Sequence, residues 1–198
     1  MEFDSVVNKR HSVRSFKSKK PSWKLILEAI DSATKVPFAG NICNLKFVII
    51  EDKKVIKNLS KCCQQSWIKD VGVVVMVCSD DTHLENKYGE RGRLYSKQQS
   101  GAAIQNFLLK LVDLGLCACW IGAYTDETAR STLKIPSHIE IEAIIPIGYE
   151  KPDKTKPKKR KQELKNVIFW EEWGKNHKKS PFEEPLEEPI NTKDTRQK

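Results

Sequence analysis

The sequence lacks the arrangements of cysteine and histidine that hold a metal ion. Its six cysteines, at positions 43, 62, 63, 78, 117 and 119, form no CxxC pair, and its four histidines are scattered. A structural zinc site needs ligands at short, regular spacing, so we expect no metal centre. We interpret the cysteines as structural or incidental. A redox role for Cys62 and Cys63, or for Cys117 and Cys119, stays open.

Long hydrophobic runs are also missing. No apolar stretch approaches the roughly 18 residues of a membrane span, and residues 1–20 lack the apolar region of a secretory signal. We therefore expect a cytoplasmic protein with no membrane-embedded part. No GxGxxG fingerprint follows a strand, which argues against a dedicated dinucleotide-binding domain. No Ser-His-Asp or Cys-His nucleophile arrangement can be argued from the residues, so we assign no catalytic side chain.

The composition is that of a globular protein with one compact domain. The chain has 198 residues, of which 39% are hydrophobic and 31% charged. We place this domain at residues 1–175. Residues 176–198 carry Pro and Glu with few apolar groups, and we expect a disordered tail there.

Hydrophobic periodicity predicts a layered α/β fold. The run "VGVVVMVCSD" is apolar throughout, which is typical of a strand buried on both faces between layers of helix. We expect a mixed central sheet of four strands with helices on both faces. The predicted strands are 45–52, 71–80, 117–124 and 139–149, and the predicted helices are 2–9, 22–36, 52–66, 95–116 and 125–135.

Two segments stand apart from this pattern. Residues 80–94 are polar and contain glycine, so we interpret them as an excursion over the surface and a candidate lid. The helix predicted at 95–116 is apolar around much of its girth, which favours a central position or a place in a subunit interface. Tyr88, Arg91, Arg93 and Tyr95 are candidates for contacting a substrate, although we favour packing or solvation of the lid as the explanation for them.

Positive charge is concentrated near the C-terminus. The formal net charge is +9, and residues 151–161, "KPDKTKPKKRK", hold seven Lys or Arg against one Asp. Three interpretations are open for this run: a solvated loop, a nucleic-acid contact, or a segment that folds back onto a bound phosphate.

The heptapeptide "RHSVRSF", residues 10–16, suggests an anion site near the N-terminus. Arg10, Ser12 and Arg14 alternate along an extended segment, so their side chains leave from the same side. A guanidinium offers a planar fork of donors that matches phosphate, and the hydroxyl adds another donor. The alternative is an ordinary basic surface at a helix end.

Four segments together resemble the nitroreductase family of flavin-dependent NAD(P)H oxidoreductases. They are "RHSVRSF", "PFAGNICNLKFVII", "SGAAIQNFLLKLVDLGLCACWIGAY" and "IPIGYEKPDKTKPKKR", in the family's order and spacing, and the resemblance covers residues 2–173. It implies the nitroreductase fold, a homodimer, and flavin mononucleotide (FMN) held without a covalent bond between the two subunits. It also argues against nucleic acid as the partner of the basic run.

The resemblance assigns the candidate cofactor-binding residues. The N-terminal motif matches the family's phosphate-binding residues, with Arg160 and Lys158 as basic residues brought from the C-terminal segment. The loop "PFAGN" matches the loop that lines the isoalloxazine from the partner subunit. The turn in "WIGAY" matches the one whose backbone amide hydrogen-bonds flavin N5, and Gln65 matches a position that bonds the pyrimidine edge, where Lys69 would add positive charge. The full set is Arg10, His11, Ser12, Arg14, Pro37, Phe38, Ala39, Asn41, Gln65, Ile121, Gly122, Lys158 and Arg160.

The chain departs from the family pattern around this loop. Phe38 stands where a small polar residue is usual, and Cys43 and Asn44 stand where Gln and Pro are common. Phe38 could equally be a core residue. Gly122 could serve only the turn that contains it.

The reaction implied by the resemblance is a ping-pong cycle. NAD(P)H delivers hydride to the flavin, and a flat electron-poor acceptor, such as a nitroaromatic, a quinone or free flavin, then takes its place. One alternative keeps FMN and the dimer for a specialised reaction, such as reductive dehalogenation or a biosynthetic oxidation. The other is a basic nucleic-acid-binding protein.

Overall fold

The computed structural model of the chain describes residues 1–152 and 163–175. The chain divides into two compact units, Met1–Asp153 and Lys154–Lys198. The extent assigned to the domain from the sequence, residues 1–175, stays a prediction. The tail expected to be disordered, 176–198, lies outside the described residues.

A four-stranded sheet forms the centre of the first unit. Its strands are β1 (Leu45–Ile50), β2 (Val73–Asp80), β3 (Cys117–Ala118) and β4 (Ile139–Gly148), in the order β1-β2-β4-β3. The four strands were predicted, but the third is shorter than expected: after Ala118 the chain keeps one bridge to β4, between Ile121 and Ile144.

The direction of the strands differs from the prediction of a mixed sheet. All pairings among the four strands are antiparallel. Within the described residues, the parallel pairing is the isolated bridge between Ser12 and Ala118. A continuous apolar run such as that of β2 indicates burial on both faces, but it does not specify the direction of the neighbouring strand.

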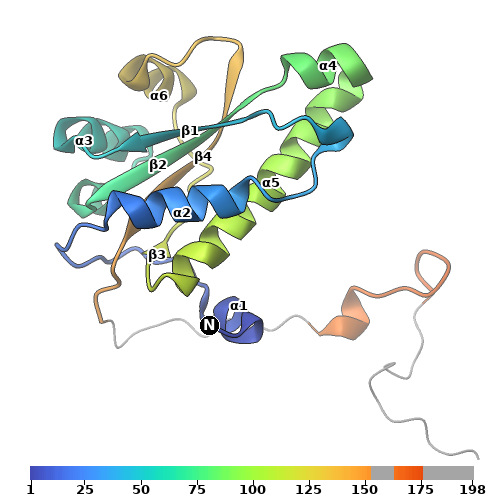
Figure 1. Cartoon of the computed structure of the whole chain (residues 1–198), viewed down its shortest axis with the longest axis horizontal. Coiled ribbons are helices and arrows are strands. Elements are labelled where there is room, and N and C mark those ends of the chain that lie inside the picture. Colours follow the sequence, from blue (N-terminus) through green and yellow to red (C-terminus); the bar gives the residue numbers. More distant parts are fainter. Residues whose placement is uncertain (153–162, 176–198) are drawn as a thin grey trace, which may run out of the picture. The chain divides into compact units, whose positions relative to one another are not determined.

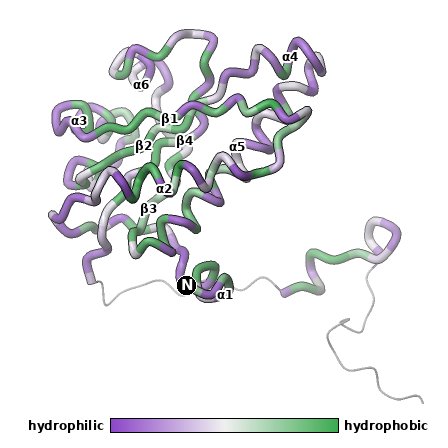
Figure 2. Tube along the Cα trace, in the orientation of Figure 1, coloured by the Kyte–Doolittle hydropathy of each residue, from purple (hydrophilic) through white to green (hydrophobic). Residues whose placement is uncertain are grey.

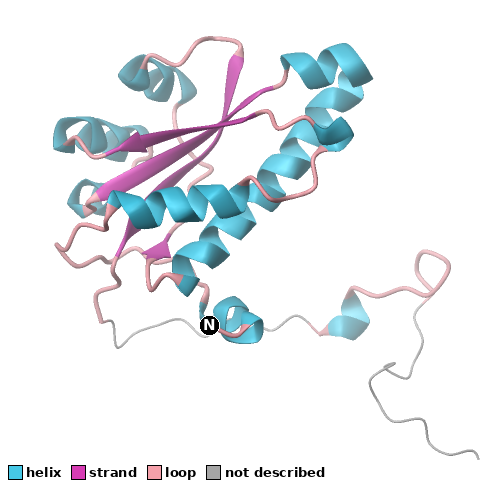
Figure 3. Cartoon of the chain, viewed as in Figure 1, coloured by secondary structure: helices cyan, strands magenta, loops and turns pink. Residues whose placement is uncertain are grey.

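Helices cover both faces of the sheet, as predicted (Figures 1 and 3). On one face lie α2 (Trp23–Ala33) and α5 (Glu90–Asp113), and on the other lie α3 (Lys53–Cys62) and α6 (Asp126–Leu133). The sheet is the most continuously hydrophobic part of the chain in Figure 2. Successive residues of β2 alternate between the two cores: Val73, Val75 and Val77 face α2 and α5, whereas Val74, Met76 and Cys78 face α3 and α6.

Side-chain caps begin two of these helices. Ser22 Oγ accepts a hydrogen bond from the Lys24 N–H at 3.4 Å, and Asp52 Oδ1 accepts from Lys54 at 2.7 Å and Val55 at 3.1 Å. The bonds from Val55 and Lys54 lower the pKa of Asp52 below its usual value. A short first helix, α1 (Phe3–Lys9), precedes them.

The candidate lid is helical. Residues that the sequence assigned to an excursion form α4 (Thr82–Tyr88) and the first turn of α5, which begins at Glu90 and not at Tyr95. Gly92 allows α4 to pack against α5, because a methyl group added there would lie 2.4 Å from the carbonyl carbon and oxygen of Leu84. Gly92 therefore belongs to a close contact between two helices and not to a loop.

Three short 3-10 turns complete the described elements: η1 (Ala39–Asn41), η2 (Ser66–Asp70) and η3 (Leu164–Asn166). The third belongs to the second unit. In that unit the ring centroids of Phe169 and Trp173 lie 4.8 Å apart, and Trp173 is 92% exposed.

Candidate functional site

The segment after α1 is extended and held at the edge of the sheet. The Val13 N–H donates to the Ala118 carbonyl at 3.1 Å, and the Lys17 N–H donates to the Tyr149 carbonyl at 2.8 Å. Val13 is buried, whereas Ser12 and Arg14 are exposed. The alternation predicted from the sequence is therefore confirmed for these two donors, which leave from the side opposite the core.

His11 is held within the protein by both ring nitrogens. Nδ1 lies 2.8 Å from the Lys9 carbonyl and Nε2 lies 3.0 Å from Glu150 Oε1. Both partners are oxygen acceptors, so both nitrogens donate when the ring carries its second proton. A contact of His11 with a bound phosphate would therefore come from its backbone, while its side chain positions the segment.

The turn after β3 lies beside this segment. The N–H of Ile121 donates to the Ile144 carbonyl at 3.0 Å, so this amide is already used by the sheet. Within the described part of the chain, the Gly122 N–H donates no hydrogen bond. Among the described residues, a methyl group added at Gly122 would meet no atom within 4 Å, and the φ of Gly122 lies outside the left-handed region. Neither packing nor the turn requires glycine here, so the open space above the backbone is the feature that a flat ligand could use.

The turn around η2 contributes the third part of the site. Trp67 stacks on Phe16 with a centroid distance of 6.0 Å, and Trp67 Nε1 donates to Gln65 Oε1 at 2.8 Å. Arg14 and Lys69 line one depression of about 750 Å³ there. Its lining is Arg14, Ser15, Phe16, Ser18, Lys20, Glu51, Lys53, Trp67, Lys69, Asp70, Val71, Gly72 and Lys151.

The loop expected to line the isoalloxazine lies elsewhere in the protomer. The Ala39 N–H donates to Gln99 Oε1 of α5 at 3.1 Å, whereas the Ser12 segment pairs with Ala118, beyond the end of α5. Gln99 and Asp113 are separated by roughly 20 Å at the rise of an α-helix. One protomer therefore does not bring both halves of the predicted site together (Figure 1).

Within this loop, Phe38 and Asn41 differ in orientation. Phe38 is half-buried and packs against the core between the sheet and α2 and α5, which supports its interpretation as a core residue. Pro37 and Asn41 are exposed. A methyl group at Gly40 would lie 2.5 Å from the Tyr88 hydroxyl, so the end of α4 covers one side of the loop.

Two of the predicted phosphate contacts, Lys158 and Arg160, lie outside the described residues. So does most of the basic run 151–161.

The cysteines are free thiols, and burial suppresses the reactivity of several of them. Burial, with a smaller contribution from neighbouring Cys62, raises the pKa of Cys63 to about 12. Burial also raises the pKa of Cys78 to about 11, and it shifts the pKa values of Cys62 and Cys119 upward. A thiol needs to ionise to act as a nucleophile, so these shifts favour a structural role.

Sequence reasoning missed a group of buried polar side chains between the loop and α5. Asn44, Asp81, Ser96 and Gln99 are at most 6% exposed and hydrogen-bond to one another. Ser96 and Gln99 are one helical turn apart on a buried face, which is a weak sequence signal for such a network.

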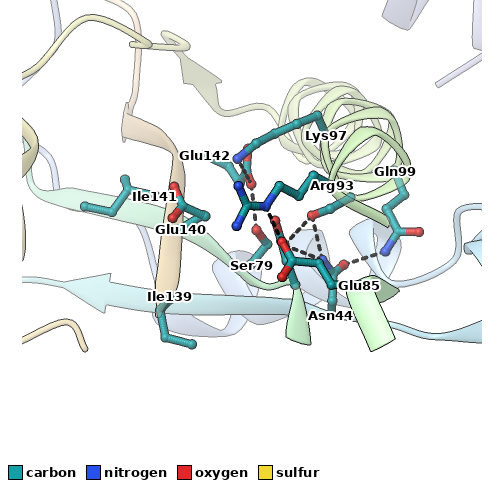
Figure 4. Close-up of polar contacts among 12 residues, drawn as sticks. Asn44, Ser79, Glu85, Arg93, Lys97, Gln99, Ile139, Glu140, Ile141 and Glu142 are labelled. Carbon is teal, nitrogen blue, oxygen red and sulfur yellow. Dashed lines mark hydrogen bonds and ion pairs between the residues drawn. The ribbon is translucent and has the colours of Figure 1, made fainter. Parts of the chain in front are cut away.

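A second polar depression of about 440 Å³ lies near this group, where charged side chains of α4, α5 and β4 pair (Figure 4). Arg93 pairs with Glu85, and Lys97 Nζ lies 2.8 Å from Glu142 Oε1. Arg93, a candidate substrate contact, is thus engaged within α4 and α5. No cluster of His, Cys, Asp and Glu suited to a metal ion occurs among the residues described. In the same part of the chain, every helix is too short or too polar to cross a membrane.

Comparison with known proteins identifies the family. The Nitroreductase family model matches residues 7–72 and 59–149, so the chain belongs to the nitroreductase family. A protein of Archaeoglobus fulgidus named "Putative NADH dehydrogenase/NAD(P)H nitroreductase" is 26% identical over 150 residues, covering 73% of this chain and 83% of that protein. Iodotyrosine deiodinase of Thermotoga neapolitana is 26% identical over 178 residues, covering 80% of this chain and 93% of the deiodinase.

Solved structures support the same fold. The FMN-dependent nitroreductase of Clostridium difficile R20291 aligns with a TM-score of 0.69 at 21% identity, covering 85% of this chain and 98% of that one. The α+β architecture with a four-stranded sheet is therefore a nitroreductase fold.

Proposed function

We propose that this chain is an FMN-dependent oxidoreductase that takes hydride from NAD(P)H and reduces a flat, electron-poor acceptor such as a nitroaromatic, a quinone or a flavin. The observation that carries the proposal is that two cations from distant segments, Arg14 and Lys69, line one depression beside the segment in which Ser12 pairs with Ala118. Ser12 and Arg14 are exposed, and so is Gly122, whose N–H donates no hydrogen bond among the described residues.

The candidate residues match the phosphate and the ring edges of FMN in charge and hydrogen-bonding capacity. Arg10, Ser12 and Arg14 would hold the phosphate, because charged and hydroxyl donors bind its oxygens strongly. Lys158 and Arg160 would add charge to that end. Gln65 and Lys69 would face the pyrimidine edge, where a positive charge stabilises negative charge on the ring. The Gly122 N–H would donate to the ring edge, while the Ile121 amide keeps the turn attached to β4.

Bound FMN would supply the hydride chemistry, and the protein would supply position and electrostatics. The side chains needed for this role are donors and cations, and no nucleophile is required. The free thiols agree with this, because their raised pKa values make them poor nucleophiles at neutral pH.

The arrangement within one protomer favours a homodimer. Pro37, Phe38, Ala39 and Asn41 lie with the middle of α5, remote from the Ser12 segment, so a second copy would have to bring this loop to the flavin. Several large apolar side chains of the first unit are at least 36% exposed, which suits burial against another chain. They are Met1, Phe3, Val7, Trp23, Leu27, Ile49, Leu94 and Trp120.

The candidate lid would act next to the loop. Tyr88 and Tyr95 form an edge-to-face pair with centroids 5.2 Å apart, and the Tyr88 hydroxyl borders Gly40. Residues 80–94 would therefore influence which acceptor reaches a ring lined by this loop.

Reductive dehalogenation is the second candidate. The likeness to the deiodinase of Thermotoga neapolitana extends over more of this chain than the likeness to the Archaeoglobus protein, at the same identity. An acceptor of that kind would be a halogenated phenol in place of a nitroaromatic or quinone.

The test is the absorbance of the purified protein after incubation with FMN and removal of free cofactor. Bound flavin gives peaks near roughly 375 and 450 nm. Mixing the reduced protein with quinones, nitroaromatics and halogenated phenols then identifies the acceptor. A protein that retains no flavin, or that stays monomeric with flavin bound, contradicts the proposal. Strong salt-dependent binding to nucleic acid without flavin would favour the third interpretation of the sequence.

A further inference from the structure

Four buried polar side chains from separate segments meet beside the 37–41 loop. Asn44 precedes β1, Asp81 follows β2, and Ser96 and Gln99 lie on α5. Their exposed fractions are 3%, 6%, 0% and 4%. We call these four residues the Asn44 cluster. Polar groups this deeply buried are costly unless each finds a partner, so the contacts within the cluster are strongly constrained.

Asn44 is the centre of the cluster. Its Nδ2 donates to Asp81 Oδ1 at 3.1 Å and to Ser96 Oγ at 2.7 Å, and Ser96 Oγ donates to Asp81 Oδ1 at 2.5 Å. Its Oδ1 accepts from Gln99 Nε2 at 2.5 Å (Figure 4). Both amide hydrogens of Asn44 and its carbonyl are thus used, which fixes the orientation of the Gln99 amide.

Gln99 connects the cluster to the loop through two backbone groups. Its Oε1 accepts from the Ala39 N–H at 3.1 Å, and its Nε2 also donates to the Ile42 carbonyl at 3.2 Å. One side-chain amide therefore holds the backbone on both sides of Gly40 and Asn41.

The held backbone is left-handed at two consecutive residues. Gly40 and Asn41 both have φ of 58°, a region that glycine adopts freely and asparagine more often than most other residues. Two local bonds, from Asn41 to Phe38 and from Ile42 to Ala39, close the turn. The bonds from Gln99 add the link between this turn and α5.

We propose that Gln99 and Asn44 are positioning residues that set where the 37–41 loop presents its backbone to the flavin. This inference rests on the proposed function, because FMN is the ligand whose binding would depend on the position of the loop. It also gives a role to a departure from the family pattern: Asn44 stands where proline is common, and its amide supplies contacts that a proline ring lacks.

The test compares Gln99→Met with Gln98→Met in the full-length chain. Methionine keeps the length of the side chain and removes its three hydrogen bonds, two of them to the loop backbone and one to Asn44. Gln98 is the exposed neighbour on the same helix. Ser96→Ala is a milder variant that loosens the cluster without touching the loop. Three quantities are measured: hydrogen exchange at the Ala39 amide without flavin, the FMN dissociation constant, and the visible circular dichroism of bound flavin.

We expect Gln99→Met to accelerate exchange at Ala39 by about tenfold and to raise the FMN dissociation constant by about three- to tenfold, the range that follows from losing one or two hydrogen bonds. The dichroism of the bound flavin should change, because its surroundings shift. Ser96→Ala should move all three quantities in the same direction by less, and Gln98→Met should leave them unchanged.

The outcomes separate this inference from the proposed function. Unchanged exchange at Ala39 in Gln99→Met overturns the positioning role, even if wild type binds FMN. Faster exchange with unchanged FMN affinity and dichroism shows that the cluster holds the loop only for stability, and it also overturns the proposal. Failure of wild type to bind FMN overturns the proposed function, and the use of the loop by flavin with it, whatever the exchange shows.

Discussion

The buried side chain of Val13 and the carbonyl of Ala118 together determine which way the N-terminal donors face. The Val13 N–H bonds to Ala118 across 3.1 Å, and Val13 is only 4% exposed. Its neighbours Ser12 and Arg14 are thereby turned outward, next to the chain that leads to Gly122. Two segments separated by more than a hundred residues in sequence thus form one face, on which a phosphate and a flat ring could be bound together.

Replacing Arg14 by Ala should weaken FMN binding by about 10- to 100-fold, the effect of losing a hydrogen bond to a charged group. Arg14 is exposed, and its side chain forms no hydrogen bond or ion pair among the described residues, so the free energy of unfolding should change by less than about 0.5 kcal/mol. Quenching of flavin fluorescence measures the affinity, and urea denaturation measures the stability.

Lys57→Ala is the matched control for Arg14, since Lys57 is an exposed cation on α3. It removes the same charge and should leave the FMN affinity unchanged. Equal losses in the two variants would mean that only overall charge attracts the cofactor, and an unaltered affinity in Arg14→Ala would remove the phosphate assignment.

Gly122→Ala should impair FMN binding while the protein folds normally. The added methyl group meets nothing within 4 Å in the part of the chain that the structure describes, so the free energy of unfolding should stay within about 0.5 kcal/mol of wild type. A ring lying against this backbone would be pushed away, and we expect the affinity for FMN to fall by at least about tenfold.

Gly115→Ala is a control with the reverse expected outcome, a loss of stability without a loss of FMN affinity. Gly115 has φ of 74°, so alanine is strained there and should cost about 1 kcal/mol of unfolding free energy. It lies between α5 and β3 and is not among the candidate cofactor-binding residues, so the substitution should leave FMN affinity as it is. Normal FMN binding by Gly122→Ala would show that the space above Gly122 is not used by the cofactor.

Much of the fold could be predicted because its signals are local. The apolar run of β2, the cap at Ser22 and the alternation of residues 12–14 each depend on neighbours in sequence, and each is found in the structure. The strand directions were predicted wrongly because pairing partners come from distant segments. The lid was assigned to irregular surface because Gly89 and Gly92 were read as loop residues, whereas Gly92 lies in a helix and makes room for Leu84.

The candidate site could be predicted only in part, because some of its features are local in sequence and others join distant segments. The types of residue that hold a phosphate are visible in "RHSVRSF", but the use of the Ile121 amide by Ile144 and the ring contacts of His11 are not. The Asn44 cluster joins positions 44, 81, 96 and 99, and each of these residues alone is an ordinary polar residue. Only the folded chain shows that they are partners.

Gly92→Ala should destabilise the protein strongly. Its methyl group would lie 2.4 Å from backbone atoms of Leu84, which cannot move without separating α4 from α5, and we expect a loss of about 3 kcal/mol. In Gly101→Ala, in the same helix, the added methyl group meets no described atom within 4 Å, and the substitution should stabilise the protein by up to about 1 kcal/mol. Urea denaturation of the two variants checks the contrast, and similar stability would mean that α4 does not pack as described.

The raised thiol pKa values predict a loss of stability at high pH. An unfolded cysteine titrates near 9.0, whereas folded Cys63 titrates at about 12 and Cys78 at about 11. At pH 7 both states hold the protons and stability is unaffected. Between pH 9 and 11 the unfolded chain has released them and the folded chain has not, so the free energy of unfolding falls as pH rises, by about 1.4 kcal/mol per pH unit for each such thiol.

Cys63→Ala should therefore flatten this decline, although the variant is less stable at pH 7 because it leaves a small cavity. The exposed Cys43 has no such burial, and Cys43→Ala should keep the full slope. Urea denaturation at pH 7, 9 and 10 under reducing conditions gives the slopes. The contrary result is a free energy of unfolding that falls as steeply with pH in Cys63→Ala as in Cys43→Ala. Cys63 would then ionise as readily in the folded chain as in the unfolded one. It would be available as a thiolate for the redox chemistry that its burial otherwise opposes.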